Sequence, residues 1–198
     1  MFNFYKAVPA MFFTLIFAGT VAQVNFDSYE EEPATTVEAT VPTKEVVDIP
    51  VIRYVPYSIP DGDTSFKSYM DYRTITNKSS SQYKLQEKAW TDDEGLRRIN
   101  DDYIIALGTF YADKIGRRVR ITLDTGESFT AIVGDFKANC HTDNTNRYTS
   151  AGNGSKNVVE FIVDTHKMNK KPKQMGDISY CYGMKGNVQS IERIYDYE

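Results

Sequence analysis

Hydrophobic and polar residues alternate along parts of the second half of the chain, a pattern typical of half-buried β-strands. The clearest stretch is 118–123, in which apolar residues occupy every second position between arginines and a threonine. The next four residues, 124–127, read Asp-Thr-Gly-Glu, a composition typical of a short hairpin loop. Apolar residues alternate again over 129–133. The pattern therefore predicts a β-hairpin in this region.

Other stretches predict further strands and one short helix. One apolar run is ended by Gly108, as expected for a buried strand, and three more segments have strand-like composition. The four stretches are 51–55, 103–107, 157–165 and 188–195. Ser79 and Gln82 have the spacing of a capping box, which predicts a helix through 83–89. Short strands with little helix predict a mainly β domain, a small barrel with one or two short helices.

The first 22 residues have the composition of a secretory signal. Lys6 precedes an almost wholly apolar stretch, and residues 20–22 (Thr-Val-Ala) end in the small residue that a signal peptidase requires. The alternative is an uncleaved anchor, although the apolar run of about 16 residues is shorter than the roughly 20 that span a bilayer. In both cases we expect the domain outside the cytoplasm, with membrane contact only through residues 1–22.

Residues 23–50 are expected to be an acidic disordered linker that leads into a domain over 51–198. Within 27–50 there are seven acidic residues and one lysine. This segment cannot bury enough apolar surface to offset the entropy of ordering it. The chain has a net charge of −4, which leaves about +1 for residues 51–198. A nearly neutral domain has no long-range field that attracts nucleic acid, so we expect no nucleic-acid partner.

Asp135 is the first candidate for acid–base chemistry. It continues the parity of the apolar residues at 129–133, which predicts that its side chain projects to the core side just past the end of the strand. Partial burial at the mouth of a barrel would favour the protonated carboxyl group, which can act as a general acid. The alternative is an aspartate that turns the chain into the following loop, a common role for this residue type.

Two further carboxylates lie in the predicted strand 157–165. Glu160 and Asp164 share one face, opposite the apolar face that holds Phe161. Paired carboxylates can perform acid–base chemistry on a glycosidic bond. The alternative is that both lie on the solvated face of the strand. Asp164, at the strand end, is the better catalytic candidate of the two.

The chain contains two cysteines, Cys140 and Cys181, and in an exported protein such a pair predicts one disulfide. Two unpaired thiols are the alternative. Cys140 precedes His141, but adjacent side chains rarely face each other in an extended chain, which argues against a nucleophile–base pair. The two histidines, His141 and His166, have no zinc-ligand spacing, and no phosphate-binding glycine loop occurs. We therefore expect neither a metal nor a cofactor.

Aromatic residues are abundant, with 14 Tyr and 11 Phe against one Trp. Exposed rings such as those of Tyr111, Tyr148 and Tyr180 can stack on sugar rings. The alternative is that these rings pack in the core or against hairpins.

The stretch 103–135 resembles the double-psi β-barrel families of cell-wall proteins. These are the rare lipoprotein A-type lytic transglycosylases, the 3D domains named for three aspartates and, more distantly, the expansins. Residues 106–109 (Ala-Leu-Gly-Thr) match the turn after a strand, 125–126 (Thr-Gly) the hairpin turn, and 134–135 (Gly-Asp) the closing aspartate. The resemblance implies a small six-stranded double-psi barrel.

Three other segments extend or weaken this resemblance. Residues 158–165 look like the strand that carries the second aspartate, which would be Asp164. Residues 65–86 resemble the beginning of exported or prophage-associated proteins of Gram-positive bacteria. Phe-Lys-Ala at 136–138 departs from the Arg-Gly-Pro or Thr-Gly-Gly that follows the aspartate in the named families.

The resemblance implies a protein that binds peptidoglycan and cleaves its glycan. Asp135 and Asp164 are then the catalytic candidates, and the candidates for substrate binding are Thr109, Tyr111, Tyr148 and Glu160. In a lytic transglycosylase one acid protonates the glycosidic oxygen and then accepts a proton from the sugar's own 6-hydroxyl, so no activated water or metal is needed. The alternative is a non-catalytic module that binds wall glycan or a protein partner.

Overall fold

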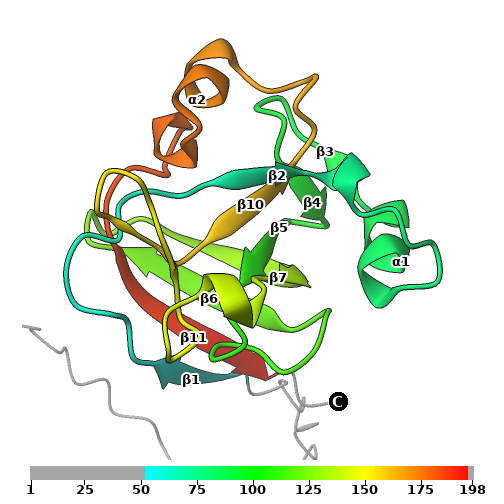
Figure 1. Cartoon of the computed structure of the whole chain (residues 1–198). Coiled ribbons are helices and arrows are strands. Elements are labelled where there is room, and N and C mark those ends of the chain that lie inside the picture. The colour runs from blue at the N-terminus through cyan, green and yellow to red at the C-terminus, as the bar shows by residue number, and fades with distance from the viewer. Residues whose placement is uncertain (1–51, 196–198) are drawn as a thin grey trace, which may run out of the picture. The chain divides into compact units, whose positions relative to one another are not determined.

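Strands from both ends of the folded region pair with each other in one large sheet (Figure 1). The structure is a computed structural model that describes residues 52–195, and the predicted signal 1–22 and linker 23–50 lie outside the described residues. The strand order is β1-β11-β6-β7-β5-β10-β2, with β4 also on β5 and β3 on β4. The strands of this sheet are β1 (Arg53–Tyr57), β2 (Tyr69–Asp71), β3 (Trp90–Thr91), β4 (Arg97–Ile99), β5 (Asp102–Leu107), β6 (Arg118–Leu123), β7 (Ser128–Phe136), β10 (Glu160–Val163) and β11 (Val188–Tyr195).

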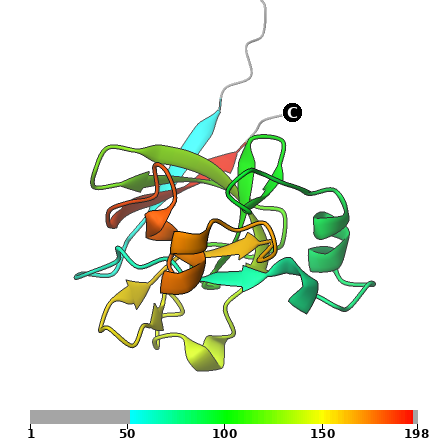
Figure 2. The ribbon, with the colours of Figure 1, turned by 90° about the horizontal axis from the view of Figure 1, so that it is seen from above.

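Smaller elements complete the domain. Two very short strands, β8 (Thr149–Ser150) and β9 (Lys156–Asn157), form a separate sheet. The α-helices α1 and α2 lie apart from each other around the large sheet (Figure 1, Figure 2). The helices are α1 (Ser81–Glu87), α2 (Lys170–Met175) and three 3-10 turns, η1 (Tyr72–Thr74), η2 (Asn139–His141) and η3 (Ile178–Tyr180). No helix among residues 52–195 is long and apolar enough to cross a membrane.

The predicted mainly β architecture with two short helices is confirmed, but the large sheet contains nine strands rather than six. The strands β2, β3 and β4 have only two or three residues each, too few for an alternating pattern to be visible in the sequence. Two neighbouring pairs, β5 with β7 and β10 with β2, are parallel. Among residues 52–195, the edge strands β1 and β2 do not pair with each other, so no strand pairing closes the sheet into a barrel.

The local sequence signals explain several elements. The predicted hairpin is formed by β6 and β7, and its loop contains Gly126 at a φ of 89°, a conformation that favours glycine. The predicted helix is α1, but its cap is Ser80 rather than Ser79, because the Ser80 hydroxyl accepts a hydrogen bond from the Tyr83 amide at 3.1 Å. The predicted strand 157–165 is divided into β9 and β10.

The middle of the large sheet, around β5 and β10, is buried on both faces. On one face, the alternate residues of β5, β6, β7 and β10 pack in the main core with side chains such as Ile121 and Phe161. On the other face, α1 covers a smaller apolar layer that includes Ile104 and Ile162. Gly134 permits this close approach: a Cβ atom there would lie 2.2 Å from Ile104 Cγ2 and 3.4 Å from Leu85 Cδ2. The helix therefore lies directly against the end of β7.

Gly108, which follows β5, is predicted to be the glycine at which a methyl group is most disruptive. A Cβ atom there would lie 1.9 Å from the carbonyl oxygen of Asn146, which also accepts a hydrogen bond from the amide of Phe110. Because the obstacle is backbone, Gly108→Ala should lower the free energy of unfolding by about 2 kcal/mol in urea titrations. In the control Gly152→Ala, nothing lies within 4 Å of the new methyl group, and we expect a change within about 0.5 kcal/mol. Equal effects of the two substitutions would refute this account.

Candidate functional site

Asp135 does not face the main core, because β7 contains a bulge. In the register with β5, Gly134 is inserted between the partners of Ile105 and Ala106, and Asp135 lies opposite Ala106. An extra residue of this kind reverses the alternation of side chains that follow it. Phe136 accordingly packs against the main core, and Asp135 lies on the face covered by α1. The predicted core-side orientation of Asp135 is therefore wrong.

Asp135 instead lines a surface pocket of about 300 Å³, here called the Asp135 pocket. The other lining residues are Met70, Thr74, Ile75, Thr76, Asn77, Ser80 and Gln82. Most of these residues carry hydroxyl or amide groups. Asp135 Oδ1 accepts a hydrogen bond from the following amide, that of Phe136, at 2.9 Å. The carboxylate is half-buried, so it combines access from the pocket with partial desolvation.

Glu160 lies on the same face of the sheet as Asp135, two strands away, with Ala106 between them in the register. This face is covered rather than solvated, and Glu160 is half-buried there. Its carboxylate lies 3.6 Å from Nζ of Lys137, a fully buried ammonium group. Burial lowers the pKa of Lys137, while the charge of Glu160 acts in the opposite direction. Glu160 is therefore engaged in an ion pair next to the Asp135 pocket.

Asp164 follows β10 and is buried, so the alternative that it lies on a solvated face is wrong. Its Oδ1 accepts a hydrogen bond from the amide of His166 at 3.0 Å and lies 3.4 Å from Nη1 of Arg73. Asp164 is four residues beyond Glu160, and Asp135 is two strands across, so the two aspartates are on the order of 15 Å apart. Asp164 does not line the Asp135 pocket.

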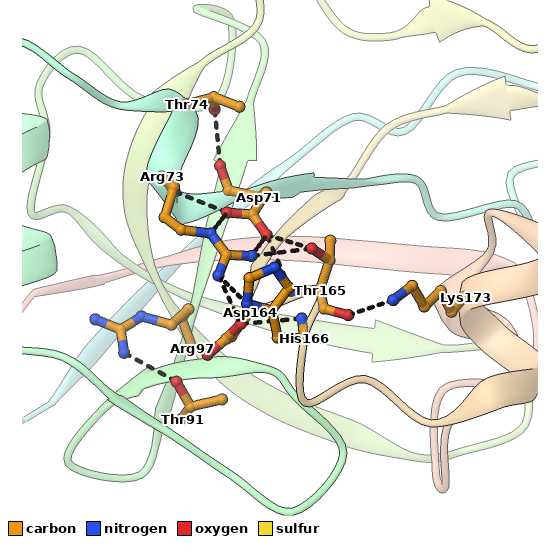
Figure 3. Close-up of polar contacts among 9 residues, drawn as sticks. All are labelled: Asp71, Arg73, Thr74, Thr91, Arg97, Asp164, Thr165, His166 and Lys173. Carbon is orange, nitrogen blue, oxygen red and sulfur yellow. Dashed lines mark hydrogen bonds and ion pairs between the residues drawn. The ribbon is translucent and has the colours of Figure 1, made fainter.

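A network around Arg73 was not predicted from the sequence (Figure 3). The Arg73 guanidinium forms a two-point ion pair with Asp71, in which Nε lies 2.7 Å from Oδ1. Its Nη2 also donates to the Thr165 hydroxyl at 3.0 Å, and its Nη1 lies 2.6 Å from Nδ1 of His166. Because an arginine only donates, Nδ1 of His166 must be the acceptor. Asp71 is the last residue of the three-residue strand β2. The sequence feature near it that could have indicated an ion pair is the arginine two positions later.

The Asp71 carboxylate is the electrostatic centre of this network. Burial by itself would raise the pKa of Asp71, but hydrogen bonds from Arg73 and Thr165 outweigh burial and hold this pKa well below its ordinary value of 3.8. A carboxyl group whose pKa is depressed on folding stabilises the protein above its unfolded pKa and loses that contribution as the pH falls. The contribution of this network to the free energy of unfolding should therefore decrease as the pH falls below about 4, where the carboxyl group of the unfolded chain takes up a proton.

Asp71→Asn is expected to lower the free energy of unfolding at pH 7 by about 2 kcal/mol, because Arg73 loses a charged acceptor in a partly buried site. The variant should also lose less stability than the wild type between pH 4 and pH 2. Urea titrations at several pH values measure both effects. The control is Asp113→Asn, which removes an exposed carboxylate paired with Arg117 and should cost less stability than Asp71→Asn. If the free energy of unfolding of Asp71→Asn depended on pH as that of the wild type does, the role of Asp71 in acid stability would be contradicted.

A second pocket, of about 430 Å³, adjoins the first and shares Ile75 and Thr76 with it. We call it the tyrosine pocket, and its other lining residues are Tyr72, Arg73, Lys78, Tyr83, Gln86 and Glu87. Arg97 stacks on the Tyr72 ring, with Cζ 4.4 Å from the centroid, and donates to Gln86 Oε1 at 3.2 Å. The two pockets and the Arg73 network thus lie around the segment from η1 to α1.

The residues predicted to contact a glycan do not form one surface. Tyr111 is fully buried in the main core, and burial raises its pKa, so it is not available to a ligand. Tyr148 packs partly against the core, with Lys156 Nζ 5.2 Å from its ring centroid. Thr109 is exposed and donates to Asn139 Oδ1 at 3.0 Å. Tyr180 is exposed and lines a different pocket near α2.

The predicted disulfide is absent, because Cys140 and Cys181 are both free. Cys140 is exposed on η2, whereas Cys181 lies in the main core after η3. Burial, and then the nearby charges of Glu94, Asp92 and Asp177, raise the pKa of the Cys181 thiol to about 12. Cys181 is therefore an unreactive packing residue.

Within residues 52–195, no group of three or more His, Cys, Asp or Glu side chains is arranged to hold a metal ion. The fold and the site define a mainly β domain in which one half-buried carboxylate and a separate carboxylate–guanidinium network flank two adjoining pockets. Comparisons with protein-family models, curated proteins and solved structures find no match.

Proposed function

We propose that this domain is an exported protein that binds the glycan of a bacterial cell wall and cleaves it with Asp135 as the single acid. The observation that carries the proposal is the composition of the Asp135 pocket. Among the described residues that line it, Asp135 is the charged one, and hydroxyl and amide groups supply most of the rest. Such a lining suits a neutral polyhydroxylated ligand, with one group able to transfer a proton.

The chemistry requires two proton transfers by one carboxyl group. Protonated Asp135 donates its proton to the glycosidic oxygen as the bond from that oxygen to the anomeric carbon breaks. The resulting carboxylate then accepts the proton of the sugar's own 6-hydroxyl, whose oxygen bonds to the anomeric carbon and closes an anhydro ring. The acid is regenerated, and neither water nor a second carboxylate takes part. Asp164, held by Arg73 and the amide of His166, then has a structural role.

The proposal extends to the fold type and to the setting. A double-psi arrangement is supported by the two parallel strand pairs, β5 with β7 and β10 with β2, set among antiparallel neighbours. Export is supported by the apolar segment 1–22 and the acidic segment that follows it.

A second candidate function is a non-catalytic module that binds the same glycan. One observation favours it: Asp135 Oδ1 already accepts a hydrogen bond from the adjacent amide of Phe136, as an aspartate does when it shapes the local backbone. In this case the pockets would hold the glycan and no bond would break.

The test is to incubate the purified protein with insoluble peptidoglycan, to measure the protein that sediments with it, and to analyse the soluble fraction for sugars with an anhydro end by mass spectrometry. The proposal expects both sedimentation and anhydro products. Sedimentation without products would leave the binding module, and the absence of both would refute both functions.

A further inference from the structure

The segment around α2 carries a cluster of positive charge. Between positions 165 and 176 the sequence contains four lysines and no acidic residue, although the chain as a whole has a net charge of −4. All four lysines are exposed, and none forms an ion pair with a carboxylate of residues 52–195. We call this group the lysine surface, and its members are Lys167, Lys170, Lys171 and Lys173. The helix α2 lies at the periphery of the domain (Figure 1, Figure 2).

A pocket of about 310 Å³ adjoins the lysine surface. Its lining includes Met175 and Tyr180, whose side chains are about half exposed, together with Phe66, residues 151–153 and Asp177. We call it the Tyr180 pocket. Nζ of Lys171 lies 5.0 Å from the centroid of the Tyr180 ring, so this tyrosine borders both the pocket and the lysine surface. A volume at the small end of the range for ligand pockets suits a single sugar residue.

The composition of the Tyr180 pocket favours a neutral ring with hydroxyl groups. Met175, Tyr180 and Phe66 supply apolar surface for the face of such a ring. Asp177 is the charged residue of this lining, and its Oδ1 accepts hydrogen bonds from the amides of Lys67 and Ser179 at 3.2 and 2.9 Å. A carboxylate has acceptor capacity beyond these bonds, which suits a ligand hydroxyl group, but its charge repels an anion. An anionic group of the ligand therefore belongs outside the pocket, at the lysine surface.

The type of cation at the lysine surface favours phosphate as that anionic group. The planar fork of arginine matches a carboxylate through two parallel hydrogen bonds, whereas the lysine ammonium group is a compact point charge that binds phosphate. The four cations between positions 165 and 176 are all lysines. Lys173 donates one hydrogen bond, to the main-chain oxygen of Thr165 at 2.7 Å, and an ammonium group has three donors.

We propose that the lysine surface and the Tyr180 pocket together bind a glycan that carries phosphate groups. One sugar ring lies in the pocket against Tyr180, and the phosphate next to it lies on the lysine surface, beginning with Lys171. This site goes beyond the proposed function, because it contains neither Asp135 nor any other residue of the Asp135 pocket and requires no cleavage.

Two other anionic partners fit this surface less well. A lipid bilayer is bound by apolar side chains that project from the protein, whereas Met175 and Tyr180 line a concave pocket. Nucleic acid is attracted by a field that extends over a basic domain, whereas residues 51–198 have a net charge of about +1.

The test uses a soluble dextran phosphorylated on its hydroxyl groups, with unmodified dextran of the same length as the matched ligand. Calorimetric titration of the full-length protein in dilute salt should show binding of the phosphorylated polymer and binding of the unmodified polymer that is weaker by about tenfold or more. The double variant Lys170→Glu/Lys171→Glu should weaken binding of the phosphorylated polymer by about tenfold or more. The matched control, Lys84→Glu/Lys88→Glu, makes the same change of charge at two exposed lysines of α1 and its C-cap and should bind like the wild type.

A second pair of variants tests the contact with the sugar ring. Tyr180→Ala should weaken binding of the phosphorylated dextran by about fivefold or more and leave binding of inorganic polyphosphate unchanged, because polyphosphate has the charge but no ring. The control Tyr182→Ala removes a tyrosine that is 91% exposed and does not line the pocket, and it should bind the phosphorylated dextran like the wild type. Circular dichroism checks that each variant is folded.

The inference would be overturned if the wild type failed to bind the phosphorylated dextran or if folded Lys170→Glu/Lys171→Glu bound it normally. An equal loss of polyphosphate binding in Tyr180→Ala would leave a site for charge alone and overturn the glycan site. Tighter binding to phosphatidylglycerol vesicles or to single-stranded DNA than to the phosphorylated dextran would assign the surface to a membrane or to nucleic acid instead. The release of anhydro sugars from peptidoglycan is a separate measurement, so the failure of this site and the failure of the proposed function are distinguishable.

Discussion

Asp135→Asn is expected to reduce the release of anhydro sugars from peptidoglycan by a factor of about 10² or more, the usual contribution of a positioned general acid. Asparagine has nearly the same volume and can still accept the hydrogen bond from the Phe136 amide, but it cannot donate an acidic proton. Sedimentation with peptidoglycan should persist, because the hydroxyl and amide groups of the pocket remain. The rate of product release and thermal melting of both proteins are the measurements.

Asp164→Asn provides the matched control for this prediction. It makes the same chemical change at a carboxylate that is bound by Arg73 and His166 and that lines neither pocket. It should lower stability and leave product release per folded molecule unchanged. If Asp135→Asn releases products as fast as the wild type, Asp135 is not the acid. If it only loses about 1 kcal/mol of stability, Asp135 is a backbone-shaping residue.

Lys67→Met is expected to lower the free energy of unfolding by about 3 kcal/mol, the largest stability effect that we predict. The ammonium group is fully buried and donates to the carbonyl oxygens of Ser65, Met184 and Gly186 at 2.9, 3.0 and 2.7 Å. Burial lowers the pKa of Lys67 to about 8, against the opposing effect of Asp177, so the group still carries its three donors at pH 7. Methionine fits a similar volume but leaves three carbonyl groups without a donor.

The matched control is Lys185→Met, which removes an exposed lysine from the same segment and should change stability by less than about 0.5 kcal/mol. Urea titrations at pH 7 measure both variants. Because Lys67 connects the segment before β2 to the segment before β11, amide hydrogen exchange should accelerate around Met184 and Gly186 in Lys67→Met. A change as small as that of the control would show that the three hydrogen bonds contribute little net stability.

The sequence determined those features that depend on neighbouring residues. Alternation over 118–133 predicted β6, β7 and the loop between them. The capping-box spacing of Ser79 and Gln82 predicted α1 to within one position of its cap. The continuous apolar run of β5 predicted a strand buried on both faces. These signals are local, because side-chain alternation, turn residues and helix caps act over a few positions.

The tertiary structure decided the orientation of the carboxylates and the fate of the cysteines. A single inserted residue, Gly134, reversed the side of the sheet that Asp135 faces, and only the register with β5 reveals that insertion. Asp71 and Asp164 are 93 positions apart, and pairing of β2 with β10 brings them to the same arginine. Cys181 is buried in the core while Cys140 is exposed. These outcomes follow from pairing between distant strands, and no local pattern encodes which distant strand becomes the neighbour.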